Sequence, residues 1–229
     1  MKLLPNEPDL GPWQAVPAAD VVTLLQQRRP AGRSLIVAID GRGAGGKTTT
    51  AGALCVAANE AAERAVCLST DDIAWRQARF DWDYLLADNV LVPVRAGRGV
   101  CWRPPAWVSY GRDGAVEVPA GTTMLFVEGV GAARRQLASL LDFAVWVQSD
   151  IDLAFERGMI RDCALYGRTR EEAETSWAEW MTEELPHLAA DRPWERADLV
   201  VARTDLDIRV GENDLVVGSR SPALRPNRK

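Results

Sequence analysis

The residues best suited to chemistry lie between an apolar run and an alanine-rich segment. Residues 41–48 follow the spacing G-x-x-x-x-G-K-[ST]. Glycines in such a loop let backbone N–H groups converge on an anion, the lysine can reach the β- and γ-phosphates, and the hydroxyl can ligate Mg²⁺. The spacing therefore predicts a loop that binds the phosphates of a nucleotide. Its expected contacts are Gly41, Gly43, Ala44, Gly45, Gly46, Lys47, Thr48 and Thr49.

Two carboxylates are expected close to this loop. Asp71, with Asp72 beside it, follows the predicted strand 65–68, and Glu128 ends the apolar run 122–127. Parallel strands place ligands beyond their carboxyl ends, so both acids fall on the edge that carries the loop. We expect Asp71 to accept a proton from a hydroxyl, and Thr48, Asp71 and Glu128 to hold Mg²⁺. The alternative is a helix cap for the aspartate pair and an incidental acid for Glu128.

Arginines later in the chain indicate a segment that closes over the phosphates. Arg157 and Arg161 are spaced i, i+4 and share one face of a predicted helix, and Arg168 follows in a polar turn. Guanidinium groups match phosphate oxygens and can offset the charge of a transition state. We expect Arg157 to contact the nucleotide and Arg161 and Arg168 to assist the reaction from a lid over residues 161–170. An ordinary solvated helix face is the alternative.

Composition and periodicity indicate one α/β domain over residues 1–229. Hydrophobic residues make up 47% of the chain, charged residues 26%, and the net charge of −5 favours no nucleic-acid partner. Strands alternate with helices, which predicts a mostly parallel sheet flanked by helices. We expect an irregular arm over residues 1–17, an excursion from the sheet over 96–121 and a disordered tail over 219–229.

The four cysteines show no C-x-x-C spacing and no apolar run reaches the length of a membrane span, so we expect a cytoplasmic protein without a membrane partner. The single histidine, His187, disfavours histidine-based metal sites and Ser-His-Asp catalysis. The sequence leaves open whether the chain forms a homo-oligomer.

Taken together, the motifs resemble the uridine kinase family of phosphate-loop kinases, which includes phosphoribulokinase and pantothenate kinase relatives. The matching stretches follow the family's order between about residues 33 and 203. They are residues 40–48, 69–72, 80–83, 125–129, 157–162, 167–168 and 196–201. The resemblance implies the three-layer phosphate-loop NTPase fold. It also implies transfer of the γ-phosphate of ATP, with Mg²⁺, to a hydroxyl of a nucleoside-like small molecule.

The same resemblance implies roles for individual residues. Asp71 would be the general base and Glu128 part of the Mg²⁺ site. Asp81, or alternatively Asp83, would bind the sugar hydroxyls of the acceptor. Arg157, Arg161 and Arg168 would belong to the lid.

One segment departs from the family pattern. Uridine kinases carry a Tyr-Asp-Phe motif followed by a histidine, whereas residues 105–110 here place Ala106 at the acid and Tyr110 at the histidine. Trp107 could stack on a flat base or pack in the core. The phosphorylating residues therefore match the family while those that recognise the base do not, and we do not expect uridine to be the preferred acceptor.

Two other readings of the loop are a regulatory GTPase or ATPase and an ATP-binding module without turnover. A GTPase should carry an Asn-Lys-x-Asp motif and an Asp-x-x-Gly switch, and the sequence has neither in the expected places. We therefore favour a kinase.

Overall fold

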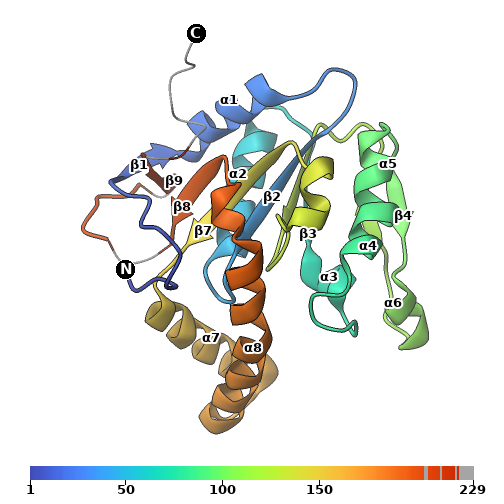
Figure 1. Cartoon of the computed structure of the whole chain (residues 1–229). Coiled ribbons are helices and arrows are strands. Elements are labelled where there is room, and N and C mark those ends of the chain that lie inside the picture. Colours follow the sequence, from blue (N-terminus) through green and yellow to red (C-terminus); the bar gives the residue numbers. More distant parts are fainter. Residues whose placement is uncertain (204–205, 212, 220, 222–229) are drawn as a thin grey trace.

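A seven-stranded sheet forms the centre of the computed structural model, which describes residues 1–203, 206–211, 213–219 and 221 (Figure 1). Among these residues the strand order is β1-β9-β8-β7-β2-β6-β3. The five neighbours from β8 to β3 are mutually parallel, and β9 and β1 complete the sheet by antiparallel pairing. The mostly parallel α/β fold expected from the sequence is confirmed. The strands are β1 (Trp13–Pro17), β2 (Leu35–Gly41), β3 (Ala65–Ser69), β6 (Met124–Glu128), β7 (Phe143–Gln148), β8 (Leu199–Ala202) and β9 (Asp214–Gly218).

Both faces of the central strands are buried, which explains their nearly continuous apolar sequences. In β2, Leu35, Val37 and Ile39 join the cluster under α1 (Ala18–Arg28) and α2 (Lys47–Glu60). Ile36 and Ala38 point to the opposite face and pack against a second cluster. Successive side chains of the strand therefore pack alternately into two hydrophobic cores, one on each face of the sheet. Helices cover both faces, so the sheet lies between two helical layers.

The second layer comes from the segments between β3 and β6 and from the segment that follows β6. Residues 83–95 are helical throughout but change hydrogen-bonding register twice, with Pro93 in the first turn of the last piece, where a missing N–H is tolerated. The expected excursion at 96–121 contains a two-stranded sheet and a short helix. The elements of this layer are α3 (Thr70–Ala74), α4 (Asp83–Leu86), η1 (Ala87–Leu91), α5 (Val92–Arg95), β4 (Val100–Trp102), α6 (Pro105–Ser109), β5 (Val116–Val118) and η2 (Arg135–Leu140).

Helices α7 (Ile151–Tyr166) and α8 (Arg170–Asp191) form a hairpin beyond the carboxyl ends of the parallel strands (Figure 1). The turn begins at Gly167, in the left-handed conformation (φ 64°), and Thr169 and Glu172 close the first turn of α8 as a capping box. A Cβ on Gly158 would lie 2.4 Å from the Trp177 ring, so a glycine lets the two helices pack closely. A short 3₁₀ turn, η3 (Pro193–Glu195), leads from α8 to β8.

The N-terminal arm is more ordered than expected. Residues 13–17 form β1, which pairs with β9, so the irregular part ends before Trp13. Glu7, in the irregular part, is buried and forms an ion pair with Arg42 of the glycine-rich loop. Its other carboxylate oxygen accepts from Trp146 Nε1 (2.9 Å) and Gln148 Nε2 (3.0 Å). Through Glu7, the N-terminal arm thus holds Arg42 of the glycine-rich loop in place.

The tail is described only in part. Ser221, inside the expected tail, is buried, and its hydroxyl oxygen accepts from the Val200 N–H of β8 at 2.9 Å. Residue 220 and residues 222–229 lie outside the described residues. Among the residues that are described, no helix combines the length and the apolar character needed to cross a membrane.

The Glu7→Ala substitution should lower the free energy of unfolding by about 3–5 kcal/mol, because Arg42 would stay buried without its partner. Lys2→Ala, in the same arm, is the control. Its ion pair with Asp152 is exposed (side chains 62% and 68% exposed), so we expect a much smaller loss of stability than in Glu7→Ala. Urea denaturation measures both changes. Equal stability of Glu7→Ala and wild type would contradict a supporting role for the arm.

His187 should titrate far below an ordinary histidine. Its ring stacks on Phe80 with centroids 4.1 Å apart, and burial, followed by repulsion from Arg134, lowers its pKa from 6.5 to about 4. Between about pH 6.5 and about pH 4 the imidazole of His187 is protonated in the unfolded chain but neutral in the folded chain. The free energy of unfolding therefore decreases as the pH falls through this window, and His187 has no effect on it above about pH 6.5.

Because the chain has one histidine, a proton NMR titration follows this group without ambiguity. His187→Phe keeps a ring against Phe80 and should lose less stability across that pH window than wild type. A midpoint near 6.5 would mean that the ring is exposed and that α8 does not pack on Phe80 in solution.

Candidate active site

The glycine-rich loop lies between the end of β2 and the start of α2. Gly46, the residue before α2, has φ 97°, a conformation that side chains with a Cβ rarely adopt. A Cβ there would also lie 2.9 Å from the Cβ of Arg203, which follows β8. The Lys47 ammonium is buried within the loop and donates to the Arg42 carbonyl oxygen at 2.8 Å. Loop and helix N-terminus together form the cradle expected for phosphates.

A buried carboxylate at the end of β2 fixes the position of this loop. Asp40 is fully buried and accepts three backbone N–H bonds, from Gly41 (2.7 Å), Gly131 (2.9 Å) and Ala133 (2.9 Å). Burial raises its pKa, and the three N–H donors oppose that effect. The loop is therefore tied to the segment that follows β6.

Thr48 and Glu128 meet directly, as expected for two groups around one cation. The Thr48 hydroxyl donates to Glu128 Oε1 at 3.2 Å, and Glu128 is buried. Burial raises the pKa of the Glu128 carboxyl, the nearby Lys47 charge opposes this, and Asp71 adds to it. Glu128 and Asp71 line the same cavity, so a cation between them would relieve the repulsion between their carboxylates.

The donor set fits Mg²⁺. Oxygen ligands from one hydroxyl and one or two carboxylates, completed by phosphate oxygens and water, are what this ion takes. Among the described residues no group of three or more His, Cys, Asp or Glu could hold a metal ion by itself.

The two aspartates after β3 have different surroundings. Asp71 lines the cavity beside the loop and forms no ion pair with any described residue. Asp72 instead pairs with Arg112 at 2.5 Å, and its backbone carbonyl accepts from Trp107 Nε1 at 2.8 Å. Asp71 therefore lies beside the phosphate-binding loop, whereas Asp72 binds residues of the 96–121 segment.

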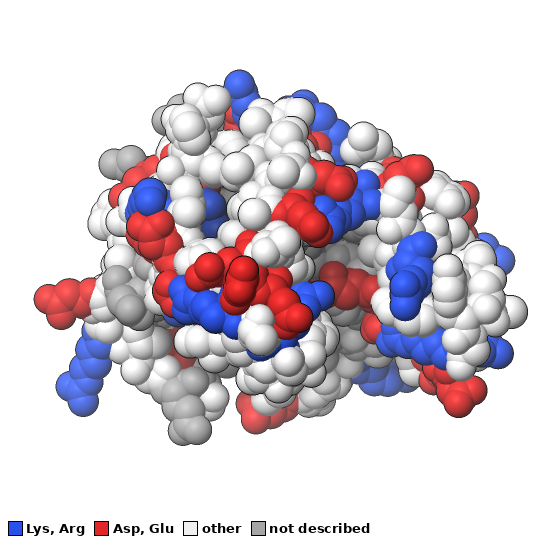
Figure 2. All heavy atoms as spheres, turned by 90° about the horizontal axis from the view of Figure 1, so that it is seen from below, with Lys and Arg blue, Asp and Glu red and all other residues white. Residues whose placement is uncertain are grey.

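The three arginines expected in the lid, Arg157, Arg161 and Arg168, line the same cavity. Arg161 and Arg168 each donate to the buried Asp162 at 2.9 Å, and Arg157 donates to the Arg203 carbonyl oxygen at 2.5 Å. The cavity encloses about 660 Å³. Figure 2 views this edge and shows a hollow with acidic atoms inside it and basic atoms along its rims. The lining includes Gly43, Ala44, Gly46, Lys47, Thr48, Thr49, Asp71, Glu128, Arg157, Arg161 and Arg168.

Helix α8 contributes a contact that the sequence analysis missed. Glu184 is 2% exposed, and its Oε1 accepts from the Gly43 N–H at 2.5 Å. Burial raises the pKa of this carboxyl above its ordinary value. The sequence contains a sign of this contact, since Glu184 interrupts an apolar helix face. Ala173, Trp177 and Leu188 lie on that face at helical spacing.

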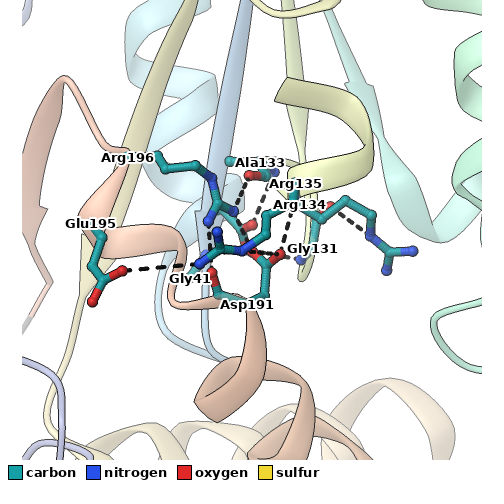
Figure 3. Close-up of polar contacts among 9 residues, drawn as sticks. Gly41, Gly131, Ala133, Arg134, Arg135, Asp191, Glu195 and Arg196 are labelled. Carbon is teal, nitrogen blue, oxygen red and sulfur yellow. Dashed lines mark hydrogen bonds and ion pairs between the residues drawn. The ribbon is translucent and has the colours of Figure 1, made fainter. Parts of the chain in front are cut away.

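The C-terminal end of α8 is fastened to the segment after β6 (Figure 3). Asp191 accepts from the Arg135 N–H at 3.0 Å and forms an ion pair with Arg196. Arg196 also donates to the Ala133 carbonyl oxygen at 2.9 Å. Since Ala133 is held by Asp40, the end of α8 and the phosphate-binding loop share one rigid support.

The residues expected to bind the acceptor lie outside the cavity lining. Asp83 forms an ion pair with the buried Arg134 at 3.1 Å, so it supports the fold and is not free for a sugar. Trp107 is buried at 5% exposure, which favours core packing over base stacking. Asp81 is exposed, and no described residue forms an ion pair with it. Arg134, which no sequence motif singled out, also donates to the Phe80 carbonyl oxygen at 3.0 Å.

Comparisons with solved structures agree with this architecture. A provisionally assigned fructose transport system kinase from Silicibacter sp. TM1040 superposes with a TM-score of 0.57 at 16% identity, over 86% of this chain and 99% of that one. A provisionally assigned uridine kinase from Bacillus stearothermophilus gives a TM-score of 0.50 at 18% identity, over 80% of this chain and 96% of that one. At such identities the likeness concerns the fold. No curated protein sequence matched.

A family model supplies the sequence evidence. The model described as "Phosphoribulokinase / Uridine kinase family" matches residues 80–207, more than half of the chain. The matched region begins after the phosphate-binding loop and includes Glu128 and the lid arginines, so loop and family model are independent observations. The chain therefore belongs to the phosphoribulokinase/uridine kinase family of phosphate-loop kinases.

Proposed function

We propose that this kinase transfers the γ-phosphate of ATP to a hydroxyl group of a nucleoside-like small molecule. One observation carries the proposal: Lys47, Thr48, Asp71 and Glu128 line a single cavity with the lid arginines. This set comprises a phosphate cradle, a metal-binding pair, a base and cations on the facing wall. Phosphoryl transfer needs these groups and little else, since its catalysis is mainly positioning and charge stabilisation.

Asp71 is the general base in this proposal. Its carboxylate takes the proton of the acceptor hydroxyl as that oxygen bonds to the γ-phosphorus, and the bond from phosphorus to the departing ADP oxygen breaks. Asp71 suits this role better than Asp72, because Arg112 already occupies the Asp72 carboxylate. Thr48, Glu128 and Asp71 would hold Mg²⁺, which supplies neutralisation of charge on the phosphate oxygens.

Cations on two walls would stabilise the transferred group. Lys47 approaches from the loop, and Arg161 and Arg168 approach from α7 and the turn after it. In the structure Asp162 holds both arginines, which keeps their guanidinium groups near the cavity. A triphosphate offers stronger charge-assisted partners, so we propose that residues 161–170 act as a lid that tightens on the nucleotide.

Two observations support a hydroxyl-bearing acceptor: the exposed carboxylate of Asp81 and membership of the kinase family. Asp81 remains available for paired hydroxyls, since a carboxylate offers two oxygens to two O–H donors. It stands two residues after Arg79, which lines the cavity. Ala106 and Tyr110 stand where the family has the acid and the histidine that read the base, and Trp107 is buried in the core, so we expect no selection of uracil.

The Asp71→Asn substitution should lower kcat by about 10²–10⁴ while ATP still binds, because it removes a base with little change in volume. Asp72→Asn is the matched control and should cost much less activity. Coupled ADP-release kinetics and calorimetric ATP binding measure the two effects. A larger loss of kcat in Asp72→Asn than in Asp71→Asn would reverse the assignment.

Among ribonucleosides, base identity should change kcat/KM by about 10–200-fold at most, because only apolar contacts would discriminate. Removing ribose hydroxyls should cost more, since Asp81 would lose its partners. The measurement compares uridine, cytidine, adenosine and a deoxynucleoside, with vitamins and sugars as further acceptors. Strong preference for uridine together with indifference to the missing hydroxyl would contradict this pocket.

The same assay separates the proposal from its alternatives. ADP release that ignores every acceptor would indicate an NTPase that couples hydrolysis to another event. ATP binding without any release would indicate a binding module. Lys47→Ala provides the inactive reference, because a positioned cation at the developing charge is worth about 10²–10³ in rate.

A further inference from the structure

A second cavity lies at the edge of the sheet opposite the phosphate-binding loop, and it encloses about 470 Å³. It is lined by segments that precede strands: the turn before β2, the turn before β3, the turn before β4 and the residues leading into β6. In Figure 1 the first of these turns lies beside the end of α5, at the edge away from α7 and α8. No residue of the candidate active site contributes to this cavity.

All the charged side chains that line this second cavity are basic. Four arginines line it, and none of its lining residues within the described part of the chain is acidic. This is a local excess in a chain whose net charge is −5. The arginines are Arg29, Arg33, Arg64 and Arg98.

Two of these arginines are held in place and two are free to bind. Arg29 forms an ion pair with Glu63 at 2.8 Å, and Arg33 binds both oxygens of Asp142 at 2.6 Å. Arg64 and Arg98 form no ion pair or side-chain hydrogen bond with any described residue. The Arg64 guanidinium lies against the backbone of Gly121, about 3.0 Å from where a Cβ would be, so the loop before β6 orients it.

We propose that this cavity binds a small molecule that carries two or more phosphate groups, as a second anion site separate from the nucleotide cradle. Guanidinium forks match phosphate oxygens, and two arginines without acidic partners can satisfy two such groups. The volume falls within the range of small-molecule sites. Glu63 and Asp142 neutralise the two paired arginines, so the net positive charge offered to a ligand comes from Arg64 and Arg98.

The test uses inorganic tripolyphosphate as the probe, with isothermal titration calorimetry at physiological salt. Lys47→Ala weakens the loop site, so saturable binding of one tripolyphosphate per chain should remain in that variant. Adding Arg64→Ala and Arg98→Ala should weaken this remaining binding at least tenfold. The matched control adds Arg28→Ala and Arg135→Ala instead, which removes the same charge from residues outside the cavity lining, and should change affinity less than threefold.

Further arms fix the ligand class and separate this site from the kinase reaction. Inorganic phosphate should bind much more weakly than pyrophosphate or tripolyphosphate, because it engages one fork. The Arg64→Ala/Arg98→Ala protein should keep wild-type ATP binding at the loop and a wild-type melting temperature.

Binding in Lys47→Ala that does not saturate, or that both double variants weaken equally, would overturn the second site. Failure of every kinase assay would leave these binding results unchanged, since none of them depends on turnover.

Discussion

The hydrogen bonding of one buried carboxylate underlies the geometry of the whole active-site edge. Asp40 would be costly to bury alone, and the N–H groups of Gly41, Gly131 and Ala133 offset that cost. The same bonds fix the phosphate-binding loop against the segment after β6. Arg196 then links Ala133 to the end of α8. Loop, strand ends and lid base thus share one frame, which suits a reaction that depends on positioning.

Helix α8 connects the two halves of the proposed reaction. Near its middle Glu184 accepts from the Gly43 N–H, and Trp180 packs on Phe80 with ring centroids 5.5 Å apart. Arg79, two residues before Asp81, donates to the Glu179 carbonyl oxygen at 2.9 Å. One helix therefore contacts both the nucleotide loop and the segment proposed for the acceptor.

An acidic side chain holds two arginines beside the cavity. Asp162 binds Arg161 and Arg168 together, so both guanidinium groups are positioned before a nucleotide arrives. Their side chains remain 46% and 38% exposed, which leaves them accessible to phosphate. Across the cavity Glu128 is buried; burial raises the pKa of its carboxyl, the Lys47 charge opposes this and Asp71 adds to it. Opposite charges thus face each other across the space where transfer would occur.

The parallel sheet, the phosphate-binding loop and the positions of Asp71 and Glu128 near the ends of their strands could be predicted from the residues alone. Short spacings and apolar runs encode these features locally. Three features appear only in the folded chain: residues 13–17 pair as a strand, Glu7 forms an ion pair with Arg42 of the loop, and Asp83 forms one with Arg134. Such partners lie far apart in the chain, and a single charged residue carries no local pattern that names the group it will meet once both are buried.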